Sequence, residues 1–152
     1  MLNAREAPWH DRGGRGFLCE FEGFGIDDAL DFTQLGINLT LLGPGEPMAM
    51  YHRENDQEDF LVLEGEALLV IEGNERPLRR WDLVHCPAGT SHVLVGAGDG
   101  PCLVLAVGAR DRSTGPDWGA TRSMRPRFGT AQVSSGRRAI RRRPTPVSLG
   151  AD

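Results

Sequence analysis

A short stretch of the chain combines one histidine with several carboxylates at the start of an apolar segment. It reads MYHRENDQEDFLVLEGEALLVIEG over residues 50–73. Four acidic residues follow His52 there, namely Glu54, Asp56, Glu58 and Asp59. Carboxylates beside a buried segment cost free energy unless a positive charge lies with them. The stretch therefore raises the hypothesis that a cation binds here.

A second histidine, His92, follows a proline-containing turn in the segment CPAGTSHVLVGA. Successive side chains of a strand point to opposite faces, so Glu54 can point the same way as His52. If the strands that carry them are neighbours in a barrel, His52, Glu58 and His92 can converge inside it. Two imidazoles and one or two carboxylates suit a divalent first-row metal. We therefore predict a site for Mn, Fe, Ni or Zn whose ligands are His52, Glu54, Glu58 and His92.

The same residues also have a purely structural explanation. His52 can be a hydrogen-bonded histidine at a strand end, and His92 can be a turn residue. Glu58 can be an exposed residue at the start of a strand. Neither His85 nor Cys86, on the strand before the proline turn, is predicted to be a ligand.

The elements that must position these residues are predicted to be short strands. From Leu35 to Ala109, apolar or alternating runs are separated by segments rich in Gly, Pro, Asn and Asp. This rhythm is typical of an all-β sandwich or barrel. The segment EGNE predicts a hairpin turn, because Gly73 and Asn74 both tolerate positive φ. No helical period interrupts the region, which argues against a parallel α/β sheet.

The first stretch resembles the first motif of the cupin superfamily, G(X)5HXH(X)3–4E(X)6G. His52, Glu58 and Gly65 match it at the required spacing. Glu54 stands where the motif has its second histidine, and Gly45 lies one residue further from His52 than the motif asks.

The second segment resembles the second cupin motif, G(X)5PXG(X)2H(X)3N. Pro87, Gly89 and His92 match it, while Trp81 and Gly96 take the places of the first glycine and the asparagine. The resemblance implies a double-stranded β-helix, or jelly-roll barrel, and often a metal held by three histidines and one glutamate. It does not by itself imply a particular reaction.

Glu54 changes what the resemblance implies for the metal. If all four residues bind, the His₂Glu₂ site is neutral with a divalent ion, and its extra oxygen favours Mn, Fe or Mg over Cu. If Glu54 turns away, His52, Glu58 and His92 form a 2-His-1-carboxylate triad like that of non-haem iron oxygenases. A third arrangement, His52 and Glu54 with His92, resembles 2-oxoglutarate dioxygenases and needs a basic partner, for which Arg110 is the candidate.

Two function classes follow. The first is a metal-dependent oxygenase or isomerase that acts on a small molecule. The second is a non-catalytic barrel that binds a small ligand or sugar, or acts as a sensor, without metal. A homodimer is expected, in which an edge strand from the N-terminal segment pairs with the partner.

The remaining sequence suggests three regions. We expect residues 1–34 to be a lead with an edge strand, 35–112 to be the barrel, and 113–152 to be a mostly disordered tail. Residues 1–117 carry 9 Arg and 20 Asp or Glu, a net charge of −11, whereas residues 118–152 carry 8 Arg and one Asp, a net charge of +7. Because the tail lacks interleaved aromatics and the body is acidic, a nucleic-acid partner is not expected.

The tail also suggests a hypothesis about the gene. If residues 121–133 are encoded by GC-rich codons, the same DNA read one base earlier encodes an amino-acid sequence that resembles a capped helix. Residues after about Ala120 would then be translated out of the original frame, which sequencing codons 115–125 would test.

Location is predicted from three observations. Cys19, Cys86 and Cys102 are far apart and lack a CxxC pattern, as expected for thiols in a reducing cytosol. The N-terminus has no apolar region typical of a signal peptide. No apolar run approaches the roughly 18 residues of a membrane span. A cytoplasmic protein without membrane contact is therefore expected.

Overall fold

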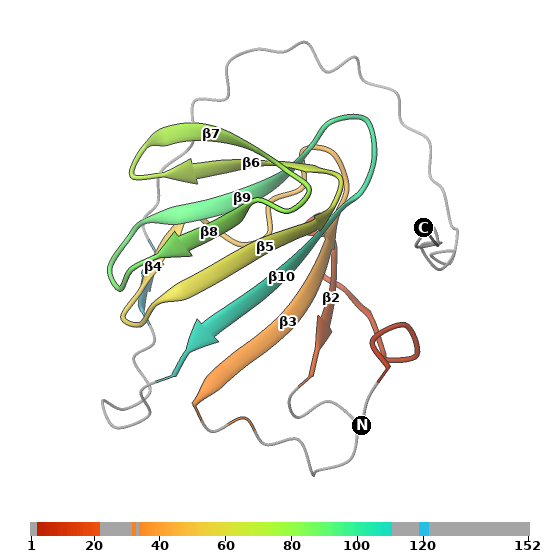
Figure 1. The fold of residues 1–152 in the computed structure, drawn as a ribbon, viewed down its shortest axis with the longest axis horizontal. Coiled ribbons are helices and arrows are strands. Elements are labelled where there is room, and N and C mark those ends of the chain that lie inside the picture. Colours follow the sequence, from red (N-terminus) through yellow and green to blue (C-terminus); the bar gives the residue numbers. More distant parts are fainter. Residues whose placement is uncertain (1–2, 22–31, 33, 111–118, 122–152) are drawn as a thin grey trace.

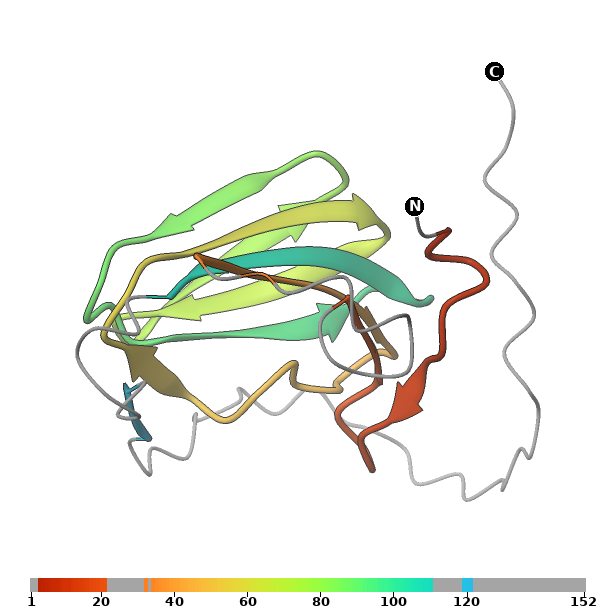
Figure 2. The same ribbon diagram turned by 90° about the horizontal axis from the view of Figure 1, so that it is seen from below.

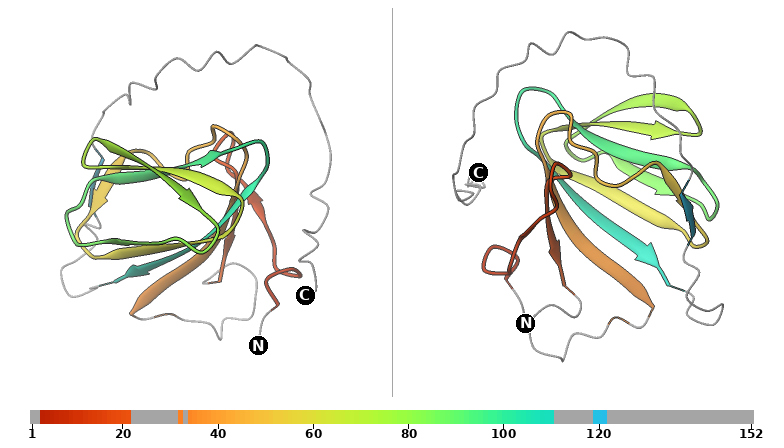
Figure 3. Two further views of the ribbon diagram at one scale, coloured as in Figure 1. Left: turned by 45° about the horizontal axis from the view of Figure 1, so that its top comes forward. Right: turned by 180° about the vertical axis from the view of Figure 1, so that it is seen from behind.

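A computed structural model describes residues 3–21, 32, 34–110 and 119–121 of the chain. These residues form antiparallel β-strands joined by turns, and none of them is helical. The strands make two sheets that lie face to face, as Figures 1, 2 and 3 show from four directions. The all-β prediction is confirmed.

The first sheet has six strands and contains the N-terminal strands at one edge. Its order is β1 (His10–Asp11), β2 (Phe17–Glu20), β3 (Leu35–Leu42), β10 (Cys102–Ala109), β5 (Glu58–Glu64) and β8 (Leu83–Cys86). Strands far apart in the sequence are neighbours here, since β10 lies between β3 and β5.

The second sheet has five strands. Its order is β11 (Gly119–Thr121), β4 (His52–Glu54), β9 (His92–Ala97), β6 (Glu66–Ile71) and β7 (Asn74–Arg79). The chain crosses from one sheet to the other between β4 and β5 and again between β8 and β9, so the two sheets close around a common interior.

Alternating apolar residues of both sheets fill this interior. On β5, Phe60 and Val62 are buried while Leu61 between them is only half-buried, as expected when one face of a strand meets the core. The same cluster includes Leu94 of β9 and Val104 of β10. Buried apolar surface of this kind is the main stabilising contribution to such a fold. Cys19, Cys86 and Cys102 are buried free thiols.

The predicted hairpin turn joins β6 to β7, with Ile71 paired to Asn74. Its two turn residues are Glu72 (φ 47°) and Gly73 (φ 76°), one position earlier than predicted. Glu72 adopts this unusual conformation while held at both ends to Ser91. Its N–H donates to the Ser91 carbonyl at 2.9 Å, and its carboxylate accepts from the Ser91 N–H.

One strand is shorter than predicted. The sequence PMAMYH over residues 47–52 predicts a strand in which Met48 and Met50 share a face with His52, but β4 begins only at His52. Pro47 forms an isolated bridge with Val95, flanked by hydrogen bonds from Gly96 to Glu46 and from Met48 to Leu94, and the chain then bends at Met48 and Ala49. Met48 is consequently 8% exposed and Met50 60% exposed, so they do not share a face.

Of the predicted tail, residues 113–152, the structure describes only residues 119–121. β11 lies within residues 113–152, where no strand was predicted, and pairs with β4. The rest of that segment lies outside the described residues, so the change of frame proposed after about Ala120 stays a prediction. The sequence DDALD at Asp27–Asp31 also suggests a helical turn, and it too lies outside the described residues. In the described part of the chain there is no helix of the length and hydropathy needed to span a bilayer.

Candidate metal centre

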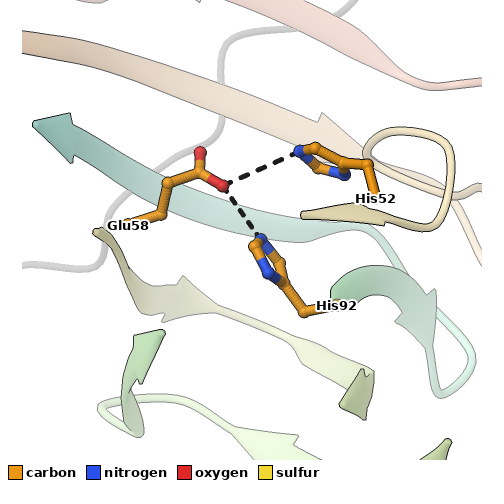
Figure 4. Close-up of side chains that lie close together, drawn as sticks. All are labelled: His52, Glu58 and His92. Carbon is orange, nitrogen blue, oxygen red and sulfur yellow. Dashed lines mark ion pairs between the residues drawn. The ribbon is translucent and has the colours of Figure 1, made fainter. Parts of the chain in front are cut away.

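The predicted ligands lie where three strands begin. His52, Glu58 and His92 are the first residues of β4, β5 and β9. His52 and His92 are direct partners between β4 and β9, and their ring centroids are 5.0 Å apart. Glu58 comes from the facing sheet. Figure 4 shows the three side chains pointing toward one another.

The three side chains approach one another closely enough to share an ion. Nε2 of His92 lies 2.9 Å from Oε2 of Glu58, and Nε2 of His52 lies 3.7 Å from the same oxygen. One ligand atom from each residue lies within 4.8 Å of the other two. His92 is only 2% exposed and His52 9% exposed. The group is therefore compact and largely withdrawn from water.

Backbone carbonyls fix which nitrogen of each histidine faces the centre. Nδ1 of His52 lies 2.7 Å from the Met50 carbonyl oxygen, and Nδ1 of His92 lies 2.9 Å from that of Thr90. A carbonyl oxygen only accepts hydrogen bonds, so each Nδ1 carries a proton and donates it. In the neutral ring, Nε2 then presents a lone pair to the centre, which is the form in which histidine binds metals.

Two buried polar atoms of the site, one from Glu58 and one from His92, face each other without a hydrogen bond. Among the described residues, neither Oε2 of Glu58 nor Nε2 of His92 has a partner with hydrogen-bond geometry, although both atoms are buried. With Nδ1 protonated, a neutral His92 and an ionised Glu58 turn lone pairs toward each other at 2.9 Å. Buried polar atoms without partners are costly. A proton or a metal ion between them removes this cost.

The pKa values of both histidines are raised, so the protonated form of each ring is favoured. Burial acts to lower the pKa of His92, but contacts with Cys86 and Glu58 outweigh it and raise the pKa to about 10. The Glu54 carboxylate is the main cause of a raised pKa at His52, against an opposing effect of burial. In the absence of metal, the centre therefore favours an extra proton.

Glu54 lies beside the group of three. Its Oε1 atom is 3.5 Å from Nε2 of His52, and its side chain is 23% exposed. The set of mutually close ligand atoms comprises His52, Glu58 and His92. Of the four residues predicted as ligands, the structure thus brings three together and leaves Glu54 in contact with one of them.

Two neighbours shape the space around Glu58. In the first sheet, Glu58 pairs with Cys86 on one side and with Gly108 on the other. A Cβ on Gly108 would lie 3.6 Å from the Glu58 side chain, an ordinary van der Waals distance, so the Glu58 side chain lies over β10 at this position. The Cys86 side chain faces inward beside it, while His85 faces outward and contacts Asp59 at 2.6 Å. Residue 86, not 85, therefore belongs to the interior.

A cavity of about 170 Å³ opens beside the centre. His52, Glu54, Glu58 and His92 all line it. Its apolar wall is formed by Leu18, Met48, Ala49, Phe60, Val93, Leu94 and Ala106. Its other polar residues are Arg12, Glu20 and Asn38. An apolar enclosure with a few convergent polar groups is typical of a small-molecule site.

Residues 38–108 match the model of the family described as the cupin domain. Together with the sheet topology, this match identifies residues 38–108 as a cupin domain, and the predicted jelly-roll barrel is confirmed. A comparison with curated protein sequences found no match.

Several solved structures are similar to this chain. A sugar phosphate isomerase of the cupin superfamily from Silicibacter pomeroyi is 28% identical, with a TM-score of 0.59, over 73% of this chain and 76% of its own. A candidate sugar phosphate isomerase from Acidithiobacillus ferrooxidans is 22% identical, with a TM-score of 0.59, over 73% and 75%. An RmlC-like cupin from Shewanella frigidimarina is 16% identical, with a TM-score of 0.60, over 75% and 93%.

One basic residue of the cavity was missed by sequence reasoning. The candidate named for a cosubstrate carboxylate was Arg110, whose side chain lies over Gly36 and does not line the cavity. Arg12 lines it instead. Arg12 belongs to the N-terminal segment, in which no motif marks it, and it reaches the cavity only through the folding of β1 and β2.

Proposed function

We propose that this protein is a divalent-metal-dependent cupin that isomerises a small sugar phosphate. The observation that carries the proposal is the convergence of two imidazole Nε2 atoms and one carboxylate oxygen within 4.8 Å at the wall of a cavity. His52, Glu58 and His92 would hold the ion. Two nitrogen donors and one or two carboxylates suit Mn, Fe, Ni or Zn.

The contact between Glu58 and His92 supports the proposal that a metal binds here. Its two buried atoms lack hydrogen-bond partners among the described residues, and an ion would satisfy both at once. The carbonyls of Met50 and Thr90 hold the rings in the orientation that binding needs. When bound, a divalent ion would polarise the carbonyl group of a sugar as a Lewis acid.

Glu54 is the residue we assign to proton transfer. An aldose–ketose isomerisation moves one proton between two neighbouring carbons and a second proton between their oxygens. The transfer between the carbons needs a base that lies near both. The Glu54 carboxylate lines the cavity outside the group of three. It can therefore accept the proton and return it. Phe60 and Leu94 on the apolar wall would limit the access of water to this exchange.

The substrate class rests on the similar structures. The protein from Silicibacter pomeroyi is named a sugar phosphate isomerase and is 28% identical over most of both chains. A cavity of about 170 Å³ with both acidic and basic lining residues suits a small, polar, charged metabolite. These two observations favour isomerisation over the oxygenase chemistry that the same ligands also permit.

A second candidate follows from the pKa of His92. Because that pKa is raised to about 10, a proton can satisfy the Glu58–His92 pair without any metal. The barrel would then bind a sugar or another small ligand without catalysis, or act as a sensor.

An activity assay separates the two. Metal-loaded protein would be incubated with a panel of triose, pentose and hexose phosphates, before and after chelation. The first proposal expects interconversion of one aldose–ketose pair, its loss on chelation and its recovery with added metal. If no pair is converted while a sugar still binds to the chelated protein, the second candidate is correct.

The assembly is proposed to be a homodimer. In the described part of the first sheet, β1 is one of the two edge strands, and its two residues are exposed. An edge strand offers unpaired backbone groups to a second copy. Sedimentation of the full chain would test this, and a monomer at micromolar concentration would contradict it.

A further inference from the structure

Arg12 enters the cavity from outside the part of the chain that matches the cupin family. The family match begins at residue 38, whereas Arg12 follows β1 in the N-terminal segment. It nevertheless lines the same cavity as His52 and Glu58. We infer that a residue in this position serves to bind the particular substrate of this protein and is not part of the shared fold.

The turn between β1 and β2 holds Arg12 in place. The Arg12 N–H donates to the Gly16 carbonyl at 3.0 Å, and the Gly13 N–H donates to Oδ1 of Asp11 at 2.8 Å. Gly16 has φ 71°, and a Cβ there would lie 2.2 Å from the Leu41 carbonyl oxygen. The turn can therefore pack against β3 only with glycine at this position. Its close packing fixes where the Arg12 side chain starts.

Most hydrogen-bond donors of the Arg12 side chain have no partner among the described residues. Its Nη1 donates to the Met48 carbonyl at 2.9 Å, which ties the turn to the loop before His52. A guanidinium has five N–H donors, and this is the one hydrogen bond from it within the described part of the chain. No carboxylate of those residues lies within 4.0 Å of it as an ion-pair partner. As far as the described residues are concerned, most of its hydrogen-bonding capacity is left for a ligand or water.

The charges around the cavity single out Arg12. The acidic lining residues are Glu20, Glu54 and Glu58, and Arg12 is the permanently charged cation among the lining residues described. Burial and then the nearby Arg15 lower the pKa of Arg12, while Glu20 opposes them. A second guanidinium close to a half-buried first one adds to the positive potential at this wall.

We propose that Arg12 determines substrate specificity by binding the anionic group of the substrate, a phosphate monoester, at the wall of the cavity. The carboxylates elsewhere in the cavity repel such a group, whereas the planar guanidinium matches two phosphate oxygens. A sugar phosphate held there has its uncharged end directed to the rest of the cavity, where His52, Glu58 and His92 lie. The choice of a sugar phosphate rests on the proposed function, while the position of the anion site rests on the cavity alone.

The experiment measures phosphate binding directly. Inorganic phosphate would be titrated into the full chain after chelation, so that no metal can bind it, and followed through the amide and arginine side-chain resonances. Arg12→Ala and Arg12→Gln should each weaken binding about tenfold or more, as expected when charge-assisted hydrogen bonds are lost. Arg12→Gln keeps a donor for the Met48 carbonyl, so it separates loss of charge from loss of the turn.

Arg53 provides a matched control. It lies on β4 between His52 and Glu54, is exposed, and does not line the cavity. Arg53→Ala removes the same charge from a neighbouring element and should leave phosphate binding within about twofold of the wild type. Equal weakening by Arg53→Ala and Arg12→Ala, or unchanged binding in both Arg12 variants, would overturn the proposal.

Turnover distinguishes this inference from the proposed function. If a sugar phosphate is isomerised, Arg12→Gln should raise KM for it more than it lowers kcat. Unchanged KM would refute the role of Arg12 and leave the isomerase intact. If no sugar phosphate is converted but phosphate binding still depends on Arg12, the isomerase proposal fails and the anion site stands.

Discussion

Nε2 of His92 lies 2.9 Å from Oε2 of Glu58, and both atoms are buried. The proton on Nδ1 of His92 is already donated to Thr90, so the two facing atoms turn lone pairs toward each other. Such a contact is stable only if a proton or a metal ion lies between the atoms. The pair therefore connects metal binding, pH and stability in this protein.

The metal-free protein should lose stability as pH rises from about 6.5 to 9. The folded-state pKa of His92, about 10, lies above its usual value of 6.5, so its contribution is complete below pH 6.5 and is lost as pH rises toward 10. The raised pKa of His52 acts in the same direction. A tenfold difference in proton affinity between the folded and unfolded chain corresponds to about 1.4 kcal/mol, so the loss should reach a few kcal/mol.

Thermal denaturation of chelated protein across this range would measure the effect. The range stops at pH 9 because burial also raises the pKa of Cys102, to about 11, which adds a loss in the same direction above that pH. Metal-loaded protein should be less sensitive, because binding of a metal to neutral histidine is favoured at higher pH. A melting temperature of the chelated protein that stays constant or rises would contradict the account.

Glu54→Gln should abolish turnover while metal content is retained. The amide cannot accept a proton, yet it keeps the size of the side chain, and the three close ligands remain. We expect a loss of kcat of about 100-fold or more, as is usual for removal of a general base. Elemental analysis and the isomerase assay would be done on one preparation. Loss of metal in this variant would instead make Glu54 the fourth ligand.

Two glycines with positive φ, Gly65 and Gly73, should respond differently to alanine. Gly65 and Gly73 have similar φ values of 74° and 76°. A Cβ at Gly65 would lie 2.3 Å from the Pro101 carbonyl oxygen, whereas a Cβ at Gly73 meets nothing within 4 Å. Gly73→Ala should cost about 1–2 kcal/mol from its left-handed backbone alone.

Gly65→Ala should cost clearly more, about 3 kcal/mol or beyond, because the clash adds to the same backbone cost. Denaturant unfolding of the two variants gives the comparison. Equal free energies of unfolding would show that β5 and β6 are not held against Pro101 as described. The last glycine of the first motif is thus a packing requirement as well as a turn residue.

Much of the fold and of the centre could be predicted because the evidence is local. Period-two alternation and glycine-rich turns locate most strands, and the apolar run LGINLTLL over residues 35–42 is β3. His52, Glu58 and His92 could be named because each stands at a strand start with the spacing of a known pair of motifs. Their convergence then follows from the closing of the two sheets.

What sequence reasoning missed depends on contacts between distant segments. Arg12 reaches the cavity through a turn that packs on Leu41 and through a hydrogen bond to Met48, 36 residues away. No periodicity records such a contact. The inward direction of Cys86 depends on the pairing of β8 with β5, which a strand of four residues does not reveal by itself. Residues 47–52 alternate like a strand, but the chain bends at Met48 and Ala49 after the single bridge between Pro47 and Val95.

Metal content tests most directly whether His52, Glu58 and His92 bind a divalent metal. Protein purified without added metal would be analysed for Mn, Fe, Ni and Zn, next to His92→Ala and the control His85→Ala, whose imidazole lies on the outer face beside Asp59. We expect one stoichiometric divalent metal in the wild type and in His85→Ala, and its loss in His92→Ala. A wild type that contains no metal and takes none up on dialysis against these ions, or a metal retained by folded His92→Ala, would contradict it.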